Sequence, residues 1–209
     1  NPERLILLAL SFARDGQVSR SSSVNGRPWE LVRDYASGVN RAVYSGWTSG
    51  VNLLVRTSDG SEHARYVQHQ RVGAGFFGVL GVRPLAGREF TAEEDRVGGP
   101  AAVVLSAELW RAAFGADPDA VGRAITLRGE PYTVVGIMPD GFSTGATADL
   151  WTPLRPSTTA EGGGTNYGVL VGLPGHVSRD RALAEIAGVG AELQRRRPAG
   201  SDGVASLTL

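Results

Sequence analysis

The chain has 209 residues, 42% of them hydrophobic, which is enough to bury a core in one domain or in two lobes. Its 21 basic residues balance its 21 acidic residues, so no overall field favours nucleic acid or an anionic membrane surface. Cysteine is absent, which excludes disulfides and thiolate metal sites and suits an oxidising compartment. The best apolar run, residues 5–13, is strand-sized and far shorter than the roughly 20 residues that cross a bilayer.

The first 72 residues predict a strand, a loop, a helix and a hairpin. The strand covers residues 4–12, and a polar loop follows at 19–25. Pro28 suits the first turn of a helix whose apolar stripe is formed by Val32, Tyr35, Ala36, Val39 and Val43. Alternation at 51–57 and a turn at Asp59-Gly60 then predict a hairpin with residues 62–72.

The middle region, residues 73–156, is rich in glycine, proline and aromatic residues. Thr91 and Glu94 have the spacing of a capping box, in which two side chains satisfy opposed backbone donors. Ser106 is expected to cap a short helix, and Asp117-Pro118 to start another turn. A second hairpin is predicted from residues 125–127 and 132–138. Three aromatic residues are expected in the core: Trp110, Phe114 and Trp151.

The last region resembles the first in pattern. A strand at 167–173 precedes a helix capped by Ser178, which ends before Pro198, and a final strand follows at 204–209. The apolar face of this helix is predicted from Leu183, Ile186, Gly190 and Leu193. This strand-helix-strand unit could pair with the one at the amino end. Because the sequence starts at Asn1 without an initiator methionine and stops within a strand, we interpret it as an excised domain.

Metal binding is weakly indicated. His63 and His69 lie six residues apart on one face of a predicted strand, and His176 lies in a turn, so the three do not have the spacing of a zinc site. The acidic run 93–95 could bind calcium, but it lacks the spacing of an EF-hand loop, and capping by Thr91 and Glu94 accounts for it.

Catalytic and cofactor motifs also have simpler explanations. Ser106 follows an apolar strand and precedes a helix, but it lacks the flanking glycines of a nucleophile elbow. Gly73, Gly75 and Gly78 match a dinucleotide fingerprint by letter, although Phe76 and Phe77 crowd that loop.

Two further patterns could bind phosphate or nucleic acid. The glycine run 162–164 is not followed by the lysine of a phosphate loop, so a flexible connection explains it better. The arginine run 195–197 suits the end of a helix and is balanced by nearby glutamates. We therefore assign no catalytic, cofactor-binding or metal-binding residue and expect no enzyme.

A series of short motifs falls in order between Phe76 and Leu154, and it strongly resembles the MacB-type periplasmic core domain of ABC transporter permeases. A weaker likeness covers Asn1 to Leu5 and residues 175–184. One departure lies at residues 171–174, where relatives often carry an Arg-Leu pair. The motifs within the main block are Phe76-Phe77-Gly78, Arg83-Pro84-Leu85-Ala86-Gly87-Arg88, Val104-Leu105-Ser106, Leu109-Trp110, Phe114-Gly115, Asp117-Pro118, Val121-Gly122-Arg123, Val134-Val135-Gly136-Ile137-Met138-Pro139 and Asp149-Leu150-Trp151-Thr152-Pro153-Leu154.

The resemblance implies an α+β fold with two lobes. A discontinuous porter-like α/β lobe would be built from both chain ends, residues 1–72 and 157–209, and a mixed α/β lobe, residues 73–156, would be inserted in it. The family domain lies between the first and second membrane helices of the permease, at the periplasmic face of the bacterial inner membrane.

The implied role is non-catalytic coupling of ATP-driven helix movement to a substrate or partner protein in the periplasm. The implied partners are an ATP-binding subunit or domain, reached through the membrane part, a second permease copy, and a periplasmic protein or exported substrate. No nucleic acid is expected, and the isolated domain is expected to be a monomer. Two alternatives stay open: a periplasmic module that binds a ligand in the crevice between lobes, and an enzyme with an unrecognised site, which the scarcity of histidine makes the weakest.

Overall fold

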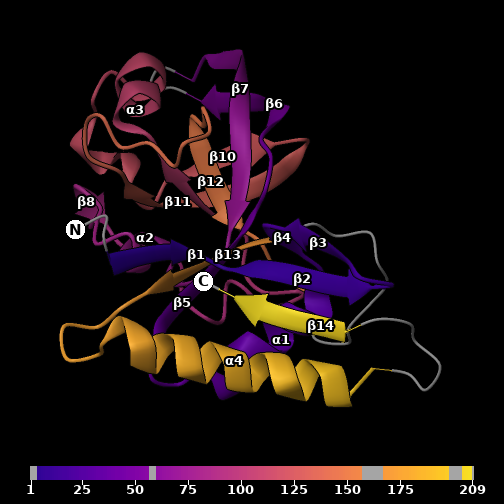
Figure 1. Cartoon of the computed structure of the whole chain (residues 1–209). Coiled ribbons are helices and arrows are strands. Elements are labelled where there is room, and N and C mark those ends of the chain that lie inside the picture. Colours follow the sequence, from indigo (N-terminus) through magenta and orange to yellow (C-terminus); the bar gives the residue numbers. More distant parts are fainter. Residues whose placement is uncertain (1–3, 57–59, 157–166, 198–203, 209) are drawn as a thin grey trace. The chain divides into compact units, whose positions relative to one another are not determined.

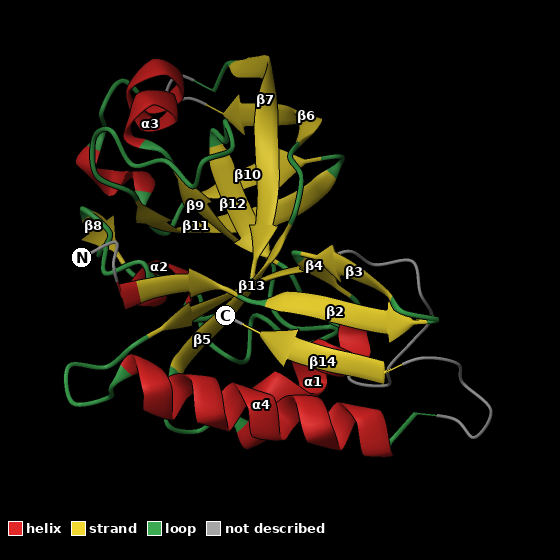
Figure 2. Cartoon of the chain, in the orientation of Figure 1, coloured by secondary structure: helices red, strands yellow, loops and turns green. Residues whose placement is uncertain are grey.

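The structure, a computed structural model, describes residues 4–56, 60–156, 167–197 and 204–208 (Figure 1). It is a mixed α/β fold in which strands predominate (Figure 2). The chain divides into two compact units. The first contains Asn1–Gly46, Val79–Gly81 and Pro156–Leu209, and the second contains Trp47–Gly78 and Val82–Arg155.

The predicted lobe boundary at residues 72/73 differs from this division. Residues 47–72, which the sequence placed with the amino-terminal lobe, lie in the second unit. The predicted hairpin is confirmed as β6 (Ser49–Arg56) and β7 (Glu62–Val72), and its turn falls partly outside the described residues. β6 also pairs with β10 (Ala124–Leu127) and β7 with β12 (Leu150–Pro153), and these partners determine which unit the hairpin joins.

The first unit contains two groups of paired strands. In one, β13 (Tyr167–Gly172) pairs with β5 (Asn40–Ser45) along one side and with β1 (Leu5–Leu7) and β4 (Ser23–Val24) along the other. In the other, β2 (Ala9–Arg14) lies between β14 (Val204–Thr208) and β3 (Gln17–Ser21). The single strand predicted at 4–12 is therefore two strands. They separate at the fully buried Leu8, whose amide donates to the Val169 carbonyl at 2.9 Å.

The polar loop predicted at 19–25 is wrong, because β3 and β4 occupy most of it. All residues of β3 are exposed, so this strand has no apolar alternation to reveal it. Its hairpin with β2 turns at Asp15 and Gly16, whose φ angles are 50° and 77°. Two consecutive positive φ angles are the mark of the tight hairpin turn that follows the twist of the strands.

The predicted helix after Pro28 is shorter than its apolar stripe. α1 spans Gly26–Tyr35, with Pro28 in its first turn. Val39 lies beyond the helix and Val43 lies on β5, and both are buried there. The three-to-four spacing therefore arises from a helix, a turn and a strand, and Tyr35, a predicted member of the stripe, is 51% exposed.

α4 (Arg179–Arg195) confirms the helix predicted after Ser178, whose hydroxyl accepts from the Arg181 amide at 3.2 Å. Its predicted apolar face is wrong at Leu183, which is 36% exposed. The helix packs against α1 and β14, and this places a neighbouring stripe inside. The buried residues are Ala182, Ile186, Val189, Gly190 and Leu193.

The second unit is built around a closed barrel of six strands. The hydrogen-bonded order is β6, β7, β12, β9 (Ala102–Leu105), β11 (Glu130–Ile137), β10 and again β6, and β8 (Ala86–Gly87) adds to β11. Closure gives every barrel strand a neighbour on both sides, which removes the exposed edges of an open sheet.

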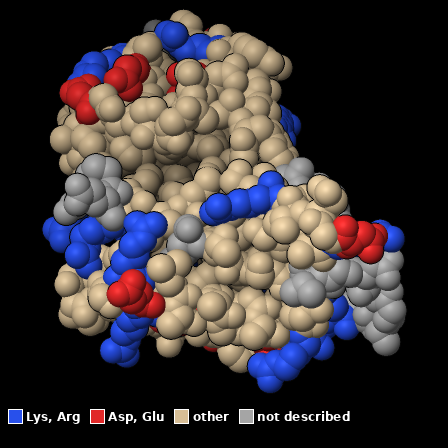
Figure 3. Space-filling view, in the orientation of Figure 1, with Lys and Arg blue, Asp and Glu red and all other residues tan. Residues whose placement is uncertain are grey.

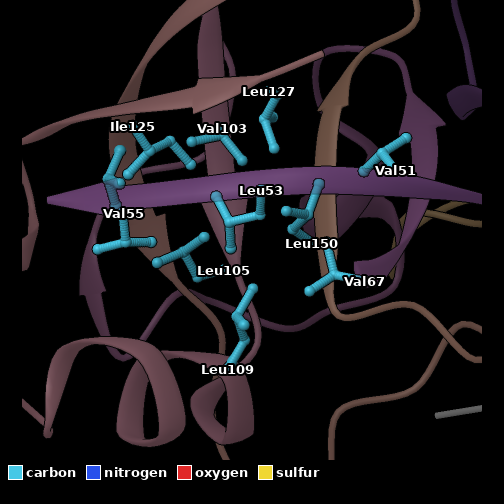
Figure 4. Close-up of a cluster of buried hydrophobic side chains, with 11 residues drawn as sticks. Val51, Leu53, Val55, Val67, Val103, Leu105, Leu109, Ile125, Leu127 and Leu150 are labelled. Atoms are coloured by element: carbon cyan, nitrogen blue, oxygen red, sulfur yellow. The ribbon is translucent and has the colours of Figure 1, made fainter. Parts of the chain in front are cut away.

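The interior of this barrel is filled by branched aliphatic side chains that point inward from its strands (Figure 4). Leu109, on the short helix α3 (Ala107–Phe114), contributes from outside the barrel wall. The buried cluster comprises Val51, Leu53, Val55, Val67, Val103, Leu105, Leu109, Ile125, Leu127, Val134 and Leu150. It gives the second unit an aliphatic core of its own.

Local turns and caps of the second unit agree with the sequence. Ser106 caps α3, since its hydroxyl accepts from the Leu109 amide at 3.1 Å. Asp117 starts the 3-10 helix Pro118–Ala120 and accepts from the Asp119 amide at 2.9 Å. The predicted second hairpin is β10 and β11, and it turns at Arg128 and Gly129 with φ angles of 53° and 85°.

Aromatic rings form a second cluster in this unit, around the short helix α2 (Phe76–Val79). Phe77 makes edge contacts with Phe76, Phe142 and Trp151, with ring centroids 5.6, 5.6 and 5.7 Å apart. Trp151 is fully buried, as predicted, but Trp110 and Phe114 are only partly buried. Phe114 packs against the margin of the aliphatic core, and Trp110 donates from its ring nitrogen to the Asp117 carbonyl at 2.8 Å. No helix among the described residues is both long and apolar enough to cross a lipid bilayer.

Candidate functional site

The start of the described chain is hydrogen-bonded to the loop between β13 and α4. Arg4 donates from Nε to the Leu173 carbonyl at 2.9 Å and from Nη2 to the carbonyls of Pro174 and Val177. The Leu173 amide in turn donates to the Arg4 carbonyl at 2.9 Å. One guanidinium thus joins the start of β1 to the turn that leads into α4 by donating to three of its backbone carbonyls.

The last strand is fixed to the same helix. β14 packs on α4 where Gly190 lies, and a β-carbon at Gly190 would approach the Leu207 amide nitrogen to 2.9 Å. Gln194, one turn later, accepts from the Ala205 amide at 2.8 Å. The absence of a side chain at Gly190 therefore allows close approach, and the Gln194 amide holds the strand.

The two ends of the chain are also joined to each other through strand pairing. Thr208 is the register partner of Ala9, which lies two residues after the end of β1. The described ends of the chain are therefore separated by only a few residues of extended strand, at about 3.3 Å per residue. We call Arg4, Gly190, Gln194 and the β2–β14 pair the end anchor. It brings both described ends of the chain into contact with α4 or with the loop that leads into it.

The three histidines do not form a cluster. His63 and His176 are exposed, whereas His69 is buried and its Nε2 lies 2.7 Å from the Thr152 hydroxyl. Within the residues that the structure describes, no group of three His, Asp or Glu side chains could hold one metal ion.

The acidic run 93–95 is engaged in contacts within the second unit. The capping box is confirmed, since the Thr91 amide donates to Glu94 at 2.8 Å and Thr91 Oγ1 accepts from the Glu94 amide at 3.2 Å, although they close a turn instead of a helix. Glu94 also accepts two hydrogen bonds from Arg88, and these hold its pKa below the usual value against the opposing effect of burial. Asp95 accepts from the amides of Ala74 and Arg155, while burial raises its pKa.

The remaining motif residues have local structural contacts. Ser106 is buried with its hydroxyl bonded to the Leu109 amide. In the loop with Gly73, Gly75 and Gly78, the Gly78 amide donates to Glu89 at 3.3 Å, and the two phenylalanines between Gly75 and Gly78 are buried. The glycine run 162–164 lies outside the described residues.

The arginine run 195–197 is divided among different partners. Arg195 and Arg196 both pair with Glu192, and Arg196 also donates to the Tyr35 hydroxyl at 2.6 Å. Arg197 lies over the Phe12 ring at 5.8 Å. On the face shown in Figure 3, basic and acidic side chains lie beside one another in several places.

The end anchor was largely missed by the sequence analysis. Arg4 and Gln194 act on backbone groups far along the chain, and a polar side chain of this kind belongs to no apolar period. Gly190 was expected on the buried face, but its specific contact with β14 was not foreseen. A glycine on the apolar stripe of a helix was the one available signal for close approach.

A family model described as the MacB-like periplasmic core domain matches residues 6–189. The chain belongs to this family of periplasmic domains from ABC-type transporter permeases.

Among curated proteins, the chain is similar to the macrolide export ATP-binding/permease protein MacB of Hahella chejuensis. The two are 29% identical over 103 residues, which cover 48% of this chain and 16% of the relative. The chain thus matches a small part of that protein's length.

Solved structures share the fold. The extracellular domain of the noncanonic ABC-type transporter YknZ from Gram-positive bacteria has a TM-score of 0.61 and 16% identity, covering 98% of this chain and 100% of that one. A domain of a putative permease protein from Porphyromonas gingivalis has a TM-score of 0.61 and 18% identity, covering 98% and 89%. The periplasmic region of MacB from Actinobacillus actinomycetemcomitans has a TM-score of 0.59 and 17% identity, covering 97% and 87%.

Proposed function

We propose that this chain is a non-catalytic coupling domain, which passes ATP-driven movement of membrane helices to the periplasmic side of the inner membrane. The observation that carries the proposal is the end anchor. Arg4 fixes the start of the chain to the loop before α4, and Gly190 and Gln194 fix the last strand to α4 itself. A membrane helix attached to either end would therefore act on the same helix and the same strand pair.

Packing supports a rigid response. The first unit buries the inner stripe of α4, and the second unit encloses its core in a barrel without open edges. Close-packed interiors resist deformation, so a displacement at the ends moves a unit as a body. In this proposal the two units are the two lobes of the family plan.

The proposed partners of this domain are inferred from its family. The curated relative is named as an ATP-binding/permease protein, so we propose an ATP-binding subunit or domain connected through the membrane part. A second permease copy and a periplasmic protein or exported substrate complete the assembly.

The test uses the full-length permease in lipid nanodiscs, in a cysteine-free background. The described chain itself contains no cysteine, so one label can be placed at the exposed Ala187 on α4. Spin labels at Ala187→Cys in two permease copies should change their separation between the nucleotide-free and ATP-bound states. An unchanged distance distribution would overturn coupling.

A matched pair within the first unit tests rigidity. Labels at Ala187→Cys and Ser19→Cys report on α4 and the exposed strand β3. Their separation should be the same in both nucleotide states. If it changes as much as the separation between copies, the first unit deforms, and its proposed movement as a rigid body is wrong even where ATP moves the domain.

A further inference from the structure

The inward-facing positions of the barrel change from apolar to polar toward one end. On β7, Val67 pairs with Val51 and belongs to the aliphatic core. The next two positions on the same side of β7 are His69 and Arg71, and the register partner of Arg71 on β12 is Thr152. Side chains that alternate by two along a strand share one face, so these polar groups continue the inner wall of the barrel.

Two of these polar side chains are more than nine-tenths buried. His69 is 8% exposed and Thr152 is 4% exposed, and His69 Nε2 lies 2.7 Å from Thr152 Oγ1. Burial, together with the nearby charges of Arg128 and Arg71, lowers the pKa of His69 to about 4. The imidazole is therefore neutral at pH 7 and can exchange a hydrogen bond without carrying charge.

A cavity of about 210 Å³ opens above this pair, lined entirely by the second unit. Its described lining residues include three arginines and no carboxylate. Arg128, in the β10–β11 turn, donates to Ser49 Oγ at 3.2 Å, and Arg155, after β12, donates to the carbonyls of Gly99 and Pro100. The lining residues within the described part of the chain are Val51, His69, Arg71, Leu127, Arg128, Tyr132, Thr152, Pro153, Leu154 and Arg155.

The arginines of this cavity hold a positive charge beside a buried hydroxyl and a neutral imidazole. Guanidinium forks match carboxylate and phosphate oxygens, and the open end of a small barrel is a common place for a ligand. The apolar side of the cavity is formed by Val51, Leu127 and Leu154. The cavity of about 210 Å³ can hold an anionic group with a short apolar extension.

We propose that this barrel mouth binds the anionic group of a small ligand, a carboxylate or a phosphate, between Arg71 and Arg128 and above the His69–Thr152 pair. The ligand's apolar part would lie against Val51 and Leu127. The site belongs to the second unit alone, so it neither depends on the coupling role nor follows from it.

The direct test is a proton NMR titration of the histidine rings in the 209-residue chain. The probes are inorganic phosphate, butyrate and the water-soluble dihexanoyl phosphatidic acid, which distinguish a free phosphate, a small carboxylate and a lipid headgroup. A bound anion stabilises the charged imidazole, so each binding probe should raise the pKa of His69 and shift its ring signals saturably. The exposed His63 and His176 serve as internal controls.

The groups that face His69 determine how this titration is interpreted. Among the described residues, Arg71 faces it from its own strand, Arg128 from the β10–β11 turn and Tyr132 from β11. Thr152 faces it from β12, and Arg155 from the segment after β12. All charged members of this set are cations. A rise in the pKa of His69 therefore reports an added negative charge in the cavity.

Two variants and one matched control locate the site. Arg128→Gln and Arg71→Gln should each weaken binding about tenfold or more, because each removes a charged donor. Arg83→Gln makes the same change of charge at an exposed position of the same unit that does not line the cavity, and it should leave the affinity unchanged.

Three results would overturn the proposal. The first is the lack of a saturable His69 shift with all three probes, and the second is equal loss of affinity in Arg83→Gln and Arg128→Gln. The third is a shift of His63 and His176 as large as that of His69, which would indicate general ionic effects. If a variant fails to fold, the His69 titration of the unaltered chain decides alone.

Discussion

Every barrel strand of the second unit has a hydrogen-bonded neighbour on both sides, and its aliphatic core is contributed by residues 51–150. The first unit is completed differently. β1 pairs with β13, and β14 pairs with β2, so its sheets are completed only when strands near the start of the chain pair with strands from late in the sequence. The comparison shows that one unit is independent of the chain ends while the other is held together by them.

This difference has a mechanical consequence. A pull on either end acts first on the strand pairs and the anchor of the first unit, whereas the barrel has no terminal strand to lose. We therefore expect substitutions in the barrel to change its own stability, and substitutions at the end anchor to change how the ends are held.

The largest expected effect is in the second unit. Trp151→Ala removes a fully buried ring that contacts Phe77 and Phe142, and it should lower the free energy of unfolding by about 3–5 kcal/mol. Urea unfolding followed by circular dichroism measures the loss, and hydrogen exchange should place it in the second unit. The control Trp47→Ala removes a ring that is 47% exposed and should cost far less. Equal losses would show that the aromatic cluster does not stabilise the unit.

The end anchor is tested by two glycines of α4. Gly190→Ala introduces a β-carbon 2.9 Å from the Leu207 amide nitrogen, and the resulting shift of β14 should destabilise the chain by about 1–3 kcal/mol. Gly188→Ala meets no atom within 4 Å and should instead stabilise by up to about 1 kcal/mol through helix propensity. Thermal unfolding of both variants gives the comparison. Stabilisation by both would mean that β14 is not held closely against α4.

A smaller effect with a defined pH dependence is expected at Glu94. Glu94→Gln removes the charge that accepts from Arg88 and should cost about 1–2 kcal/mol at pH 7. Since the folded pKa of Glu94 lies below its unfolded value, its stabilisation is present above the unfolded pKa and is lost as the pH falls through the folded pKa. Urea unfolding at several pH values should show the two proteins converging in acid. A constant difference down to low pH would contradict the ionic contribution.

The smallest effects compare the helix caps of the two units. Ser106→Ala and Ser178→Ala each remove a hydroxyl that accepts a backbone amide, and each should cost about 1 kcal/mol. The cost should be greater at Ser106, because that residue is buried and its amide partner would lose access to water. Asparagine at position 178 should restore most of the loss in thermal unfolding, whereas equal stability of Ser178→Ala and the unaltered chain would rule out capping.

The sequence was most informative where structure is local. Residues within a few positions of one another predicted the caps at Ser106 and Ser178 and the reciprocal bonds of Thr91 and Glu94. They also predicted the β6–β7 and β10–β11 hairpins. The family was also recognised from ordered motifs, and the match over residues 6–189 confirms it.

Predictions failed where one apolar pattern could satisfy two structures. The stripe from Val32 to Val43 fitted a single helix, but the chain turns after Tyr35 and continues as β5. The exposed strand β3 has no alternation of apolar and polar residues from which it could be predicted. Leu183 lies one position away from the stripe of α4 residues that tertiary packing buries. In these cases the sequence identified apolar residues, but it did not determine the backbone conformation at those positions.

By itself, the sequence determined the family, the turns, the caps and the existence of most strands and helices, because these depend on short-range chemistry. The tertiary structure decided that residues 47–72 join the barrel, that Arg4 and Gln194 hold the chain ends, and that His69 lies buried beside Thr152 under an arginine-lined cavity. These features join residues far apart in the chain. Their energies come from strand closure, close packing and desolvation, which no local pattern encodes.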